Sequence, residues 1–82
     1  MADVEYSARA ADQLEELERE TAERIVSKLD EASDFPRHFL KRLRNSQYHR
    51  LRVGDYRAEI DWREDDDVLF VRRVGHRDGF YR

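Results

Sequence analysis

The residues best suited to chemistry in this chain are arginines gathered in the segment YHRLRVGDYR, residues 48–57. Arg50 and Arg52 alternate with two apolar residues, which is typical of a strand with one basic face and one apolar face. A Gly-Asp step follows and predicts a turn into a second strand that carries Arg57. A basic hairpin with one solvated face can bind a polyanion.

The positive charge of this segment contrasts with the rest of the chain, whose net charge is -3. Residues 1–36 hold 4 basic and 11 acidic side chains (net -7), residues 37–57 hold 7 and 1 (net +6), and residues 58–82 hold 5 and 7 (net -2). Arginine outnumbers lysine 14 to 2, and arginine can grip a phosphate with two parallel hydrogen bonds. The acidic part repels nucleic acid at long range, and the acidic, lysine-poor composition suits a salty cytoplasm.

Length and composition limit the possible classes of protein. Eighty-two residues predict one domain, residues 1–82, with a small core. The absence of cysteine excludes disulfides, zinc–thiolate sites and a thiol nucleophile. No apolar run approaches the ~20 residues of a membrane helix, and the N-terminus lacks the apolar core of a signal peptide. We therefore expect a soluble cytoplasmic domain without membrane association.

The first half of the chain has a strand signal followed by two helical signals. Residues 4–6 alternate and predict a short strand, and Ser7 is a candidate N-cap for the helix that follows. Apolar residues then recur at spacings of three and four in two stripes, which predicts a helical hairpin with its bend near residues 18–20. One continuous helix is the alternative. Pro36 disfavours helix at the residue before it and ends the second helix.

The second half predicts a basic connector at residues 37–47 and a meander of three strands, at residues 48–53, 56–62 and 68–74. The element order is β-α-α-β-β-β. The predicted fold class is α+β, with the N-terminal helical hairpin packed on one face of a small antiparallel sheet. The first strand can join the edge of this sheet, and the residues after 74 read as a polar, aromatic tail.

Helices on one face leave the other face of the sheet free for a ligand. We expect four arginines to meet there: Arg50, Arg52 and Arg57 from the hairpin, and Arg77 from the end of the third strand. Arg72 and Arg73 are consecutive, so alternation predicts that only one of them, Arg73, shares this face. A basic row on an exposed strand is also common as a merely solvated face.

Two motifs resemble the RelE/ParE superfamily of toxins from toxin–antitoxin pairs. YHRLRVGDYR at residues 48–57 is similar to the family's hairpin, and VGHRDGFYR at residues 74–82 is similar to its C-terminal ending. The resemblance covers almost the whole chain, and it implies a RelE-like microbial RNase fold.

RelE-type members cut mRNA in the ribosomal A site without a metal or cofactor. The resemblance implies that the ribose 2′-hydroxyl attacks the scissile phosphate, and that cations stabilise the charge that develops. It also implies two partners, a cognate antitoxin protein and mRNA in the ribosomal A site. The residues at the family's catalytic positions are Arg50, Arg52, Arg57, Arg77, His76 and Tyr81.

The roles implied for these residues differ. The first two match basic residues of the family's hairpin, while Arg57 and Arg77 match arginines that hold the phosphate. Tyr81 matches a tyrosine that orients or stacks on the substrate, and His76 stands where relatives carry a basic residue. Arginine is a poor proton donor beside lysine or histidine, which leaves His76 and Tyr81 as the side chains able to move a proton. Each also has a simpler interpretation, His76 as a surface residue and Tyr81 as part of a frayed end.

Three functions are compatible with these residues. The first is a toxin that acts as a ribosome-dependent mRNA endoribonuclease and inhibits translation. The alternative is a ParE-like inhibitor of DNA gyrase without RNase activity, and the third is a catalytically weakened binding module. The terminal tyrosine and the full arginine set favour the RNase.

Overall fold

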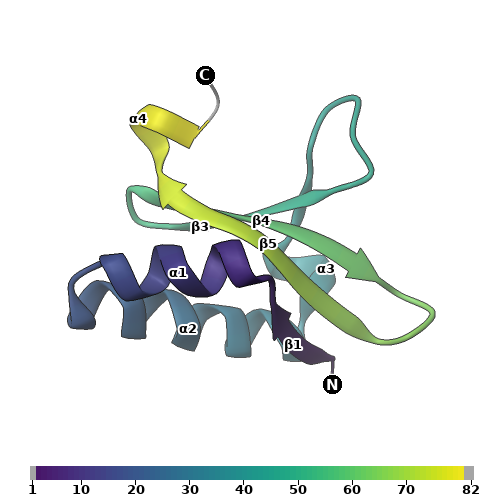
Figure 1. Ribbon diagram of the computed structural model, residues 1–82. Helices are drawn as coiled ribbons and strands as arrows, with labels where there is room; N and C mark the ends of the chain where they lie inside the picture. The colour runs from purple at the N-terminus through teal and green to yellow at the C-terminus, as the bar shows by residue number, and fades with distance from the viewer. Residues whose placement is uncertain (1, 81–82) are drawn as a thin grey trace.

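The computed structural model describes residues 2–80, which form one mixed sheet with helices on both of its sides (Figure 1). The elements, in chain order, are β1 (Asp3–Tyr6), α1 (Ala8–Glu16), α2 (Arg19–Asp34), α3 (Pro36–Phe39), β2 (Lys41–Arg42), β3 (His49–Val53), β4 (Tyr56–Arg63), β5 (Val68–His76) and α4 (Arg77–Phe80). The predicted order of strand, helical hairpin and meander is confirmed, and β2, α3 and α4 are additional.

The sheet has the strand order β1-β5-β4-β3-β2. The meander of β3, β4 and β5 is antiparallel, as predicted, and β1 joins its edge. β1 runs parallel to β5, because the helical hairpin carries the chain back across the sheet before the meander begins. The sheet is therefore mixed, with one parallel pair at the β1 edge.

The helical hairpin begins where local sequence signals place it, and its bend lies slightly earlier than the predicted residues 18–20. Ser7 is the N-cap of α1, and its side chain accepts a hydrogen bond from the backbone N–H of Ala10 at 3.0 Å. The chain bends between α1 and α2, at residues 17–18, so two helices form and the single continuous helix does not. Pro36 follows the end of α2 and starts α3, because proline is well tolerated in the first turn of a helix.

The core lies between the sheet and the pair α1 and α2, which cover one face of the sheet (Figure 1). Its largest fully buried side chains come from both layers: Ile25, Leu29, Leu51, Ile60, Leu69 and Val71. None of the helices within residues 2–80 combines the length and the apolar character that crossing a bilayer requires.

The other face of the sheet is partly covered by α4, which Figure 1 shows on the opposite side from α1 and α2. Phe80 anchors this short helix and is only 5% exposed. A Cβ atom at Gly75 would lie 3.0 Å from Cδ1 of Phe80, so the glycine allows the ring to pack directly on β5. Residues 77–80 are therefore a docked helix and not the expected tail.

Candidate functional site

The sheet face opposite α1 and α2 carries most of the arginines that the sequence singled out. We call it the arginine face, and it consists of Arg50, Arg52, Arg57, Glu59, Arg72 and Arg73. The register pairs Arg52 with Arg57 and Glu59 with both Arg50 and Arg73 across neighbouring strands. Side chains at these positions alternate with core residues, so they lie together on one face.

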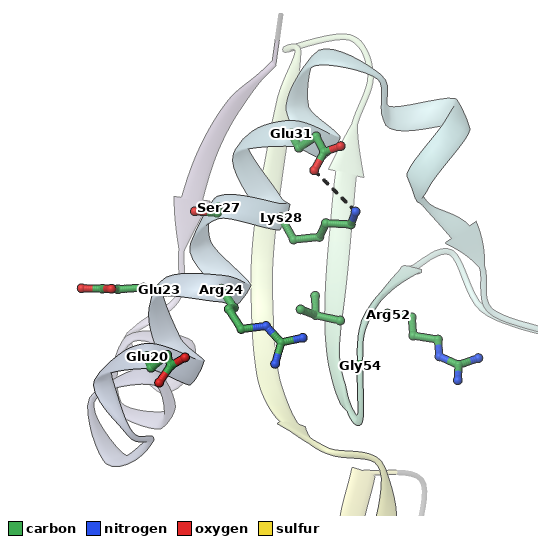
Figure 2. Close-up of a pocket in the computed structure, with 9 residues that line it drawn as sticks. Glu20, Glu23, Arg24, Ser27, Lys28, Glu31, Arg52 and Gly54 are labelled. Carbon is green, nitrogen blue, oxygen red and sulfur yellow. Dashed lines mark hydrogen bonds and ion pairs between the residues drawn. The ribbon is translucent and has the colours of Figure 1, made fainter.

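Arg50 and Arg52 are the available cations of this face. Neither guanidinium makes a hydrogen bond or ion pair within residues 2–80, and the side chain of Arg52 is exposed. Figure 2 shows Arg52 extending away from α2. Both side chains can therefore bind an external anion without first losing an internal partner.

Arg57 is differently placed, because its guanidinium is turned back onto the β3–β4 turn. Its Nη1 donates to the carbonyl oxygens of Gly54 and Tyr56, each at 2.9 Å, and the residue is only 8% exposed. Arg57 therefore stabilises the turn. It can meet a phosphate only through its remaining N–H groups or after releasing the turn.

Glu59 is a buried carboxylate in the middle of the arginine face, and sequence analysis did not single it out. It is 7% exposed and forms ion pairs with Arg72 and Arg73, the latter at 3.2 Å from Nη2 to Oε2. Both arginines reach it because the β4–β5 register shifts between Glu59 and Ile60 and leaves Arg72 as an extra residue. The expectation that only Arg73 of the two faces the site is therefore wrong. The signal that could have revealed this carboxylate is the alternation along β4, which puts Glu59 on the same side of the strand as Arg57.

The same two arginines fix neighbouring aromatic groups. Arg73 donates from Nη1 to the carbonyl oxygen of Phe80 at 3.0 Å, and its guanidinium carbon lies 4.1 Å from the centre of the Phe80 ring. Arg72 lies 3.9 Å from the centre of the Tyr48 ring. Arg73 thus links Glu59 to α4 and helps to hold this helix on the sheet.

The C-terminal candidates do not all join the arginine face. The backbone N–H of Arg77 donates to the carbonyl oxygen of Asp55 at 2.8 Å. This hydrogen bond holds α4 beside the β3–β4 turn that Arg57 stabilises. The side chain of Arg77 is exposed, and its Nε lies 3.7 Å from a carboxylate oxygen of Asp78. The Arg77 guanidinium therefore has an ionic partner on its own helix.

His76 lies on the other side of the sheet from Arg57. It pairs with Tyr56 in the register, and the two rings meet edge to face with their centres 5.3 Å apart. Its Nδ1 accepts a hydrogen bond from the backbone N–H of Asp78 at 3.2 Å. Tyr81 lies outside the described residues.

The expectation that four arginines meet on the arginine face holds in part. Arg50 and Arg52 point outward, while Arg57 is folded back onto its own turn.

Proton transfer has few candidates on the described part of this face. Glu59 and Asp61 lie on this side of β4; two arginines hold Glu59, and Asp61 forms an ion pair with Arg63 at 3.1 Å. His49 points to the helix-covered side against Trp62, with the ring centres 5.3 Å apart. Burial lowers the pKa of His49, and the charge of Arg42 lowers it further while that of Glu64 opposes the change. Within residues 2–80, no three His, Asp or Glu side chains come together as ligands for a metal ion.

A groove of about 700 Å3 lies between α2 and the end of β3 and borders the arginine face, because Arg52 is one of its lining residues (Figure 2). Its walls carry charges of both signs, including Glu20, Glu31 and Lys28, the last two joined in an ion pair at 3.4 Å. Arg24 reaches across toward the hairpin turn at Gly54. The mixed charge makes this groove a poor site for a polyanion.

The chain resembles known toxins in both sequence and structure. Residues 4–79 match the family model described as the ParE toxin of the type II toxin–antitoxin system parDE. A search of curated protein sequences found no match.

Among solved structures, the RelBE2 toxin–antitoxin complex of Mycobacterium tuberculosis superposes with a TM-score of 0.86 at 23% identity, covering 93% of this chain and 98% of the other. A mutant E. coli toxin RelE in the free state gives 0.80 at 26% identity, covering 98% and 88%. The RelB–RelE complex of Methanococcus jannaschii gives 0.74 at 26% identity, covering 94% of each chain. The family model spans nearly the whole chain and the fold agrees with it, so the chain belongs to the ParE toxin family of type II toxin–antitoxin systems, within the RelE/ParE superfamily.

Proposed function

We propose that this toxin is a ribosome-dependent mRNA endoribonuclease whose arginine face binds the RNA backbone around the scissile phosphate. The observation that supports this most directly is the pair Arg50 and Arg52. They project from one strand of the arginine face and have no partner within residues 2–80. Two unpaired guanidinium groups on one strand suit the bidentate recognition of a phosphodiester.

The proposed reaction needs no metal. The 2′-oxygen forms a bond to phosphorus, the bond from phosphorus to the 5′-oxygen breaks, the 2′-hydroxyl loses its proton and the leaving oxygen gains one. Arg50 and Arg52 stabilise the charge that builds up on the phosphate oxygens. Arg57 and Arg77 add to this charge stabilisation from the hairpin turn, where the backbone contact of Arg77 with Asp55 brings α4 close.

His76 and Tyr81 are the proposed proton carriers. His76 stands at the end of β5, next to α4, so its ring must swing around the strand end to reach the arginine face. Proton transfer is therefore the weakest part of this active site, and charge stabilisation supplies most of the rate enhancement.

The proposed partners follow from the relatives. The M. tuberculosis and M. jannaschii structures are toxin–antitoxin complexes, and we propose that this chain likewise binds a cognate antitoxin protein. Its target is mRNA in the ribosomal A site, which places its action in the cytoplasm.

Inhibition of DNA gyrase is the second candidate function. It is favoured by the matching family model, which is that of ParE, and by the use of Arg57 and Glu59 in internal contacts. A gyrase inhibitor needs a binding surface but no proton carriers, so the same arginine face can serve it.

The two functions separate in a reconstituted translation reaction and a supercoiling assay. We expect the wild type to cut ribosome-bound mRNA within A-site codons, and Arg50→Ala and Arg52→Ala each to lower the cleavage rate at least about tenfold. Arg19→Ala is the matched control, because Arg19 is exposed on α2 in an ion pair with Glu23. Intact mRNA together with inhibited supercoiling would refute the RNase proposal and support gyrase inhibition. Undiminished cleavage by both variants would show that the arginine face takes no part in the reaction.

A further inference from the structure

A second cationic site lies at the margin of the sheet where β5 continues past the end of β1. β1 ends at Tyr6, and beyond that point the start of α1, in place of a strand, lies against the edge of β5. The hydroxyl of Ser7 donates to the carbonyl oxygen of Arg72 at 2.7 Å, and the side-chain oxygen of Gln13 accepts from the backbone N–H of Val74 at 2.6 Å. These contacts fix the first turns of α1 against the strand that carries Arg72 and Arg73.

Two cavities flank this margin and share Arg9 and Arg73. One, of about 240 Å3, is lined by Ser7, Arg9, Glu59, Phe70, Arg72 and Arg73. The other, of about 270 Å3, continues along β5 and is lined by Arg9 and Arg73 together with His76 and Phe80, among others. Arg9 therefore stands between the two cavities, at the side of the arginine face that is farthest from β3.

The charge at this margin is positive despite the acidic helix beside it. Arg9 is the only basic residue among residues 1–18. It makes no ion pair or hydrogen bond within residues 2–80, although Asp12 follows three residues later on the same helix. The first cavity gathers three arginines and one carboxylate, a net charge of +2, and the paired carboxylate is buried beneath its two partners.

We propose that Arg9, with Arg72 and Arg73, forms a second phosphate subsite, which binds a phosphodiester of the single-stranded RNA a few nucleotides from the one held by Arg52. This inference rests on the proposed function, in which RNA crosses the arginine face. β3 and β5 are two strand spacings apart, about 10 Å, so one RNA strand can reach both sites. Arg9 provides an unused guanidinium, and Arg72 provides the N–H groups that Glu59 does not occupy.

The test is the salt dependence of RNA binding, measured by fluorescence anisotropy. The probe is a labelled ten-nucleotide RNA with methylated 2′-hydroxyls, which the toxin cannot cleave. Losing one phosphate contact to a single strand lowers the slope of log K against log salt by about 0.7, which corresponds to about fivefold between 0.1 M and 1 M salt. We expect this loss for Arg9→Ala and for Arg52→Ala, but not for the control Arg19→Ala.

The outcomes distinguish this subsite from the proposed function. If Arg52→Ala loses affinity and slope while Arg9→Ala matches Arg19→Ala, the second subsite is refuted and the arginine face stands. If the wild type does not bind the probe at all, the second subsite is overturned, whereas the proposed function is decided by the cleavage of ribosome-bound mRNA. Equal reductions in slope for Arg9→Ala and Arg52→Ala, with a larger reduction in the double variant, support two separate phosphate contacts.

Discussion

Glu59 controls how much positive charge the arginine face presents to a ligand. Two guanidinium groups on consecutive residues of β5 repel each other, and a carboxylate that accepts hydrogen bonds from both removes this repulsion. Arg72 and Arg73 are thereby fixed in place, and the single carboxylate cancels half of their joint charge. The charge left for an external anion is greatest at Arg50 and Arg52 on β3, and at Arg9 on the opposite margin.

His49 predicts a fall in stability under mildly acidic conditions. Burial holds its pKa below the ordinary value of about 6.5, so protonation favours the unfolded chain. Its effect on the free energy of unfolding is constant above about pH 6.5 and becomes destabilising as the pH falls below that value. We expect urea denaturation to show a smaller loss of stability from pH 6.5 to 5 in His49→Phe, which keeps a ring beside Trp62, than in the wild type.

The control for this pH effect is His38→Phe, which replaces an exposed histidine of α3. Its loss of stability over the same pH range should equal that of the wild type. If His49→Phe also keeps the full pH dependence, then acidic carboxylates and not His49 determine it.

At the scale of elements, the β3–β4 turn and α4 form one unit. Arg57 binds the carbonyl groups on two sides of the turn, and the backbone of Arg77 binds the carbonyl of Asp55 between them. Phe80 then holds the other end of α4 on β5 through Arg73. The start of α4 is therefore joined to the turn that Arg57 stabilises.

Gly75→Ala tests this unit. The new Cβ would meet the Phe80 ring at 3.0 Å, so α4 must shift outward from the sheet. We expect faster amide hydrogen exchange at residues 77–80 and a loss of about 1–3 kcal/mol in the free energy of unfolding, as for other overpacked sites. Gly79→Ala is the matched control, because a Cβ there meets nothing within 4 Å. Equal exchange in the two variants would show that Phe80 does not anchor α4.

The elements that follow from local periodicity could be predicted from the sequence, and those set by distant contacts could not. Two apolar stripes, Ser7 and Pro36 were enough to give the helical hairpin and its ends. The parallel pairing of β1 and the docking of α4 depend on partners far along the chain. The bulge opposite Glu59 breaks the alternation on which the assignment of Arg72 and Arg73 to opposite faces was based.

The candidate site shows the same division at the level of single residues. Alternation correctly placed Arg50, Arg52 and Arg57 on one face, because that depends only on strand period. Alternation could not show that Arg57 binds the backbone of its own turn. Every residue has a backbone carbonyl group, so the sequence does not indicate which of them the guanidinium will bind. Arg9 could not be assigned to the site from the sequence, because it lies in a helix that is distant along the chain from the strands that it approaches in space.

At the scale of the whole molecule, charge is separated by the sheet. The helical hairpin falls within residues 1–36, which carry a net charge of -7, and it covers one face. The arginine face lies on the other side, so an RNA strand can approach it with the sheet between it and most of the acidic side chains. The separation leaves a dense negative surface on α1 and α2 that repels itself.

This negative surface predicts that the protein becomes more stable as salt increases. Ionic screening shortens from about 10 Å at 0.1 M to about 3 Å at 1 M, so repulsion among the helix carboxylates weakens. We expect the urea midpoint to rise between 0.1 M and 2 M KCl. The rise should be smaller in a Glu15→Gln/Glu16→Gln variant, which removes two exposed charges from α1. Since salt also strengthens apolar burial equally in both proteins, only the difference between them reports charge repulsion. A wild type that is most stable at 0.1 M would mean that the ion pairs of the surface outweigh the repulsion within the helical hairpin.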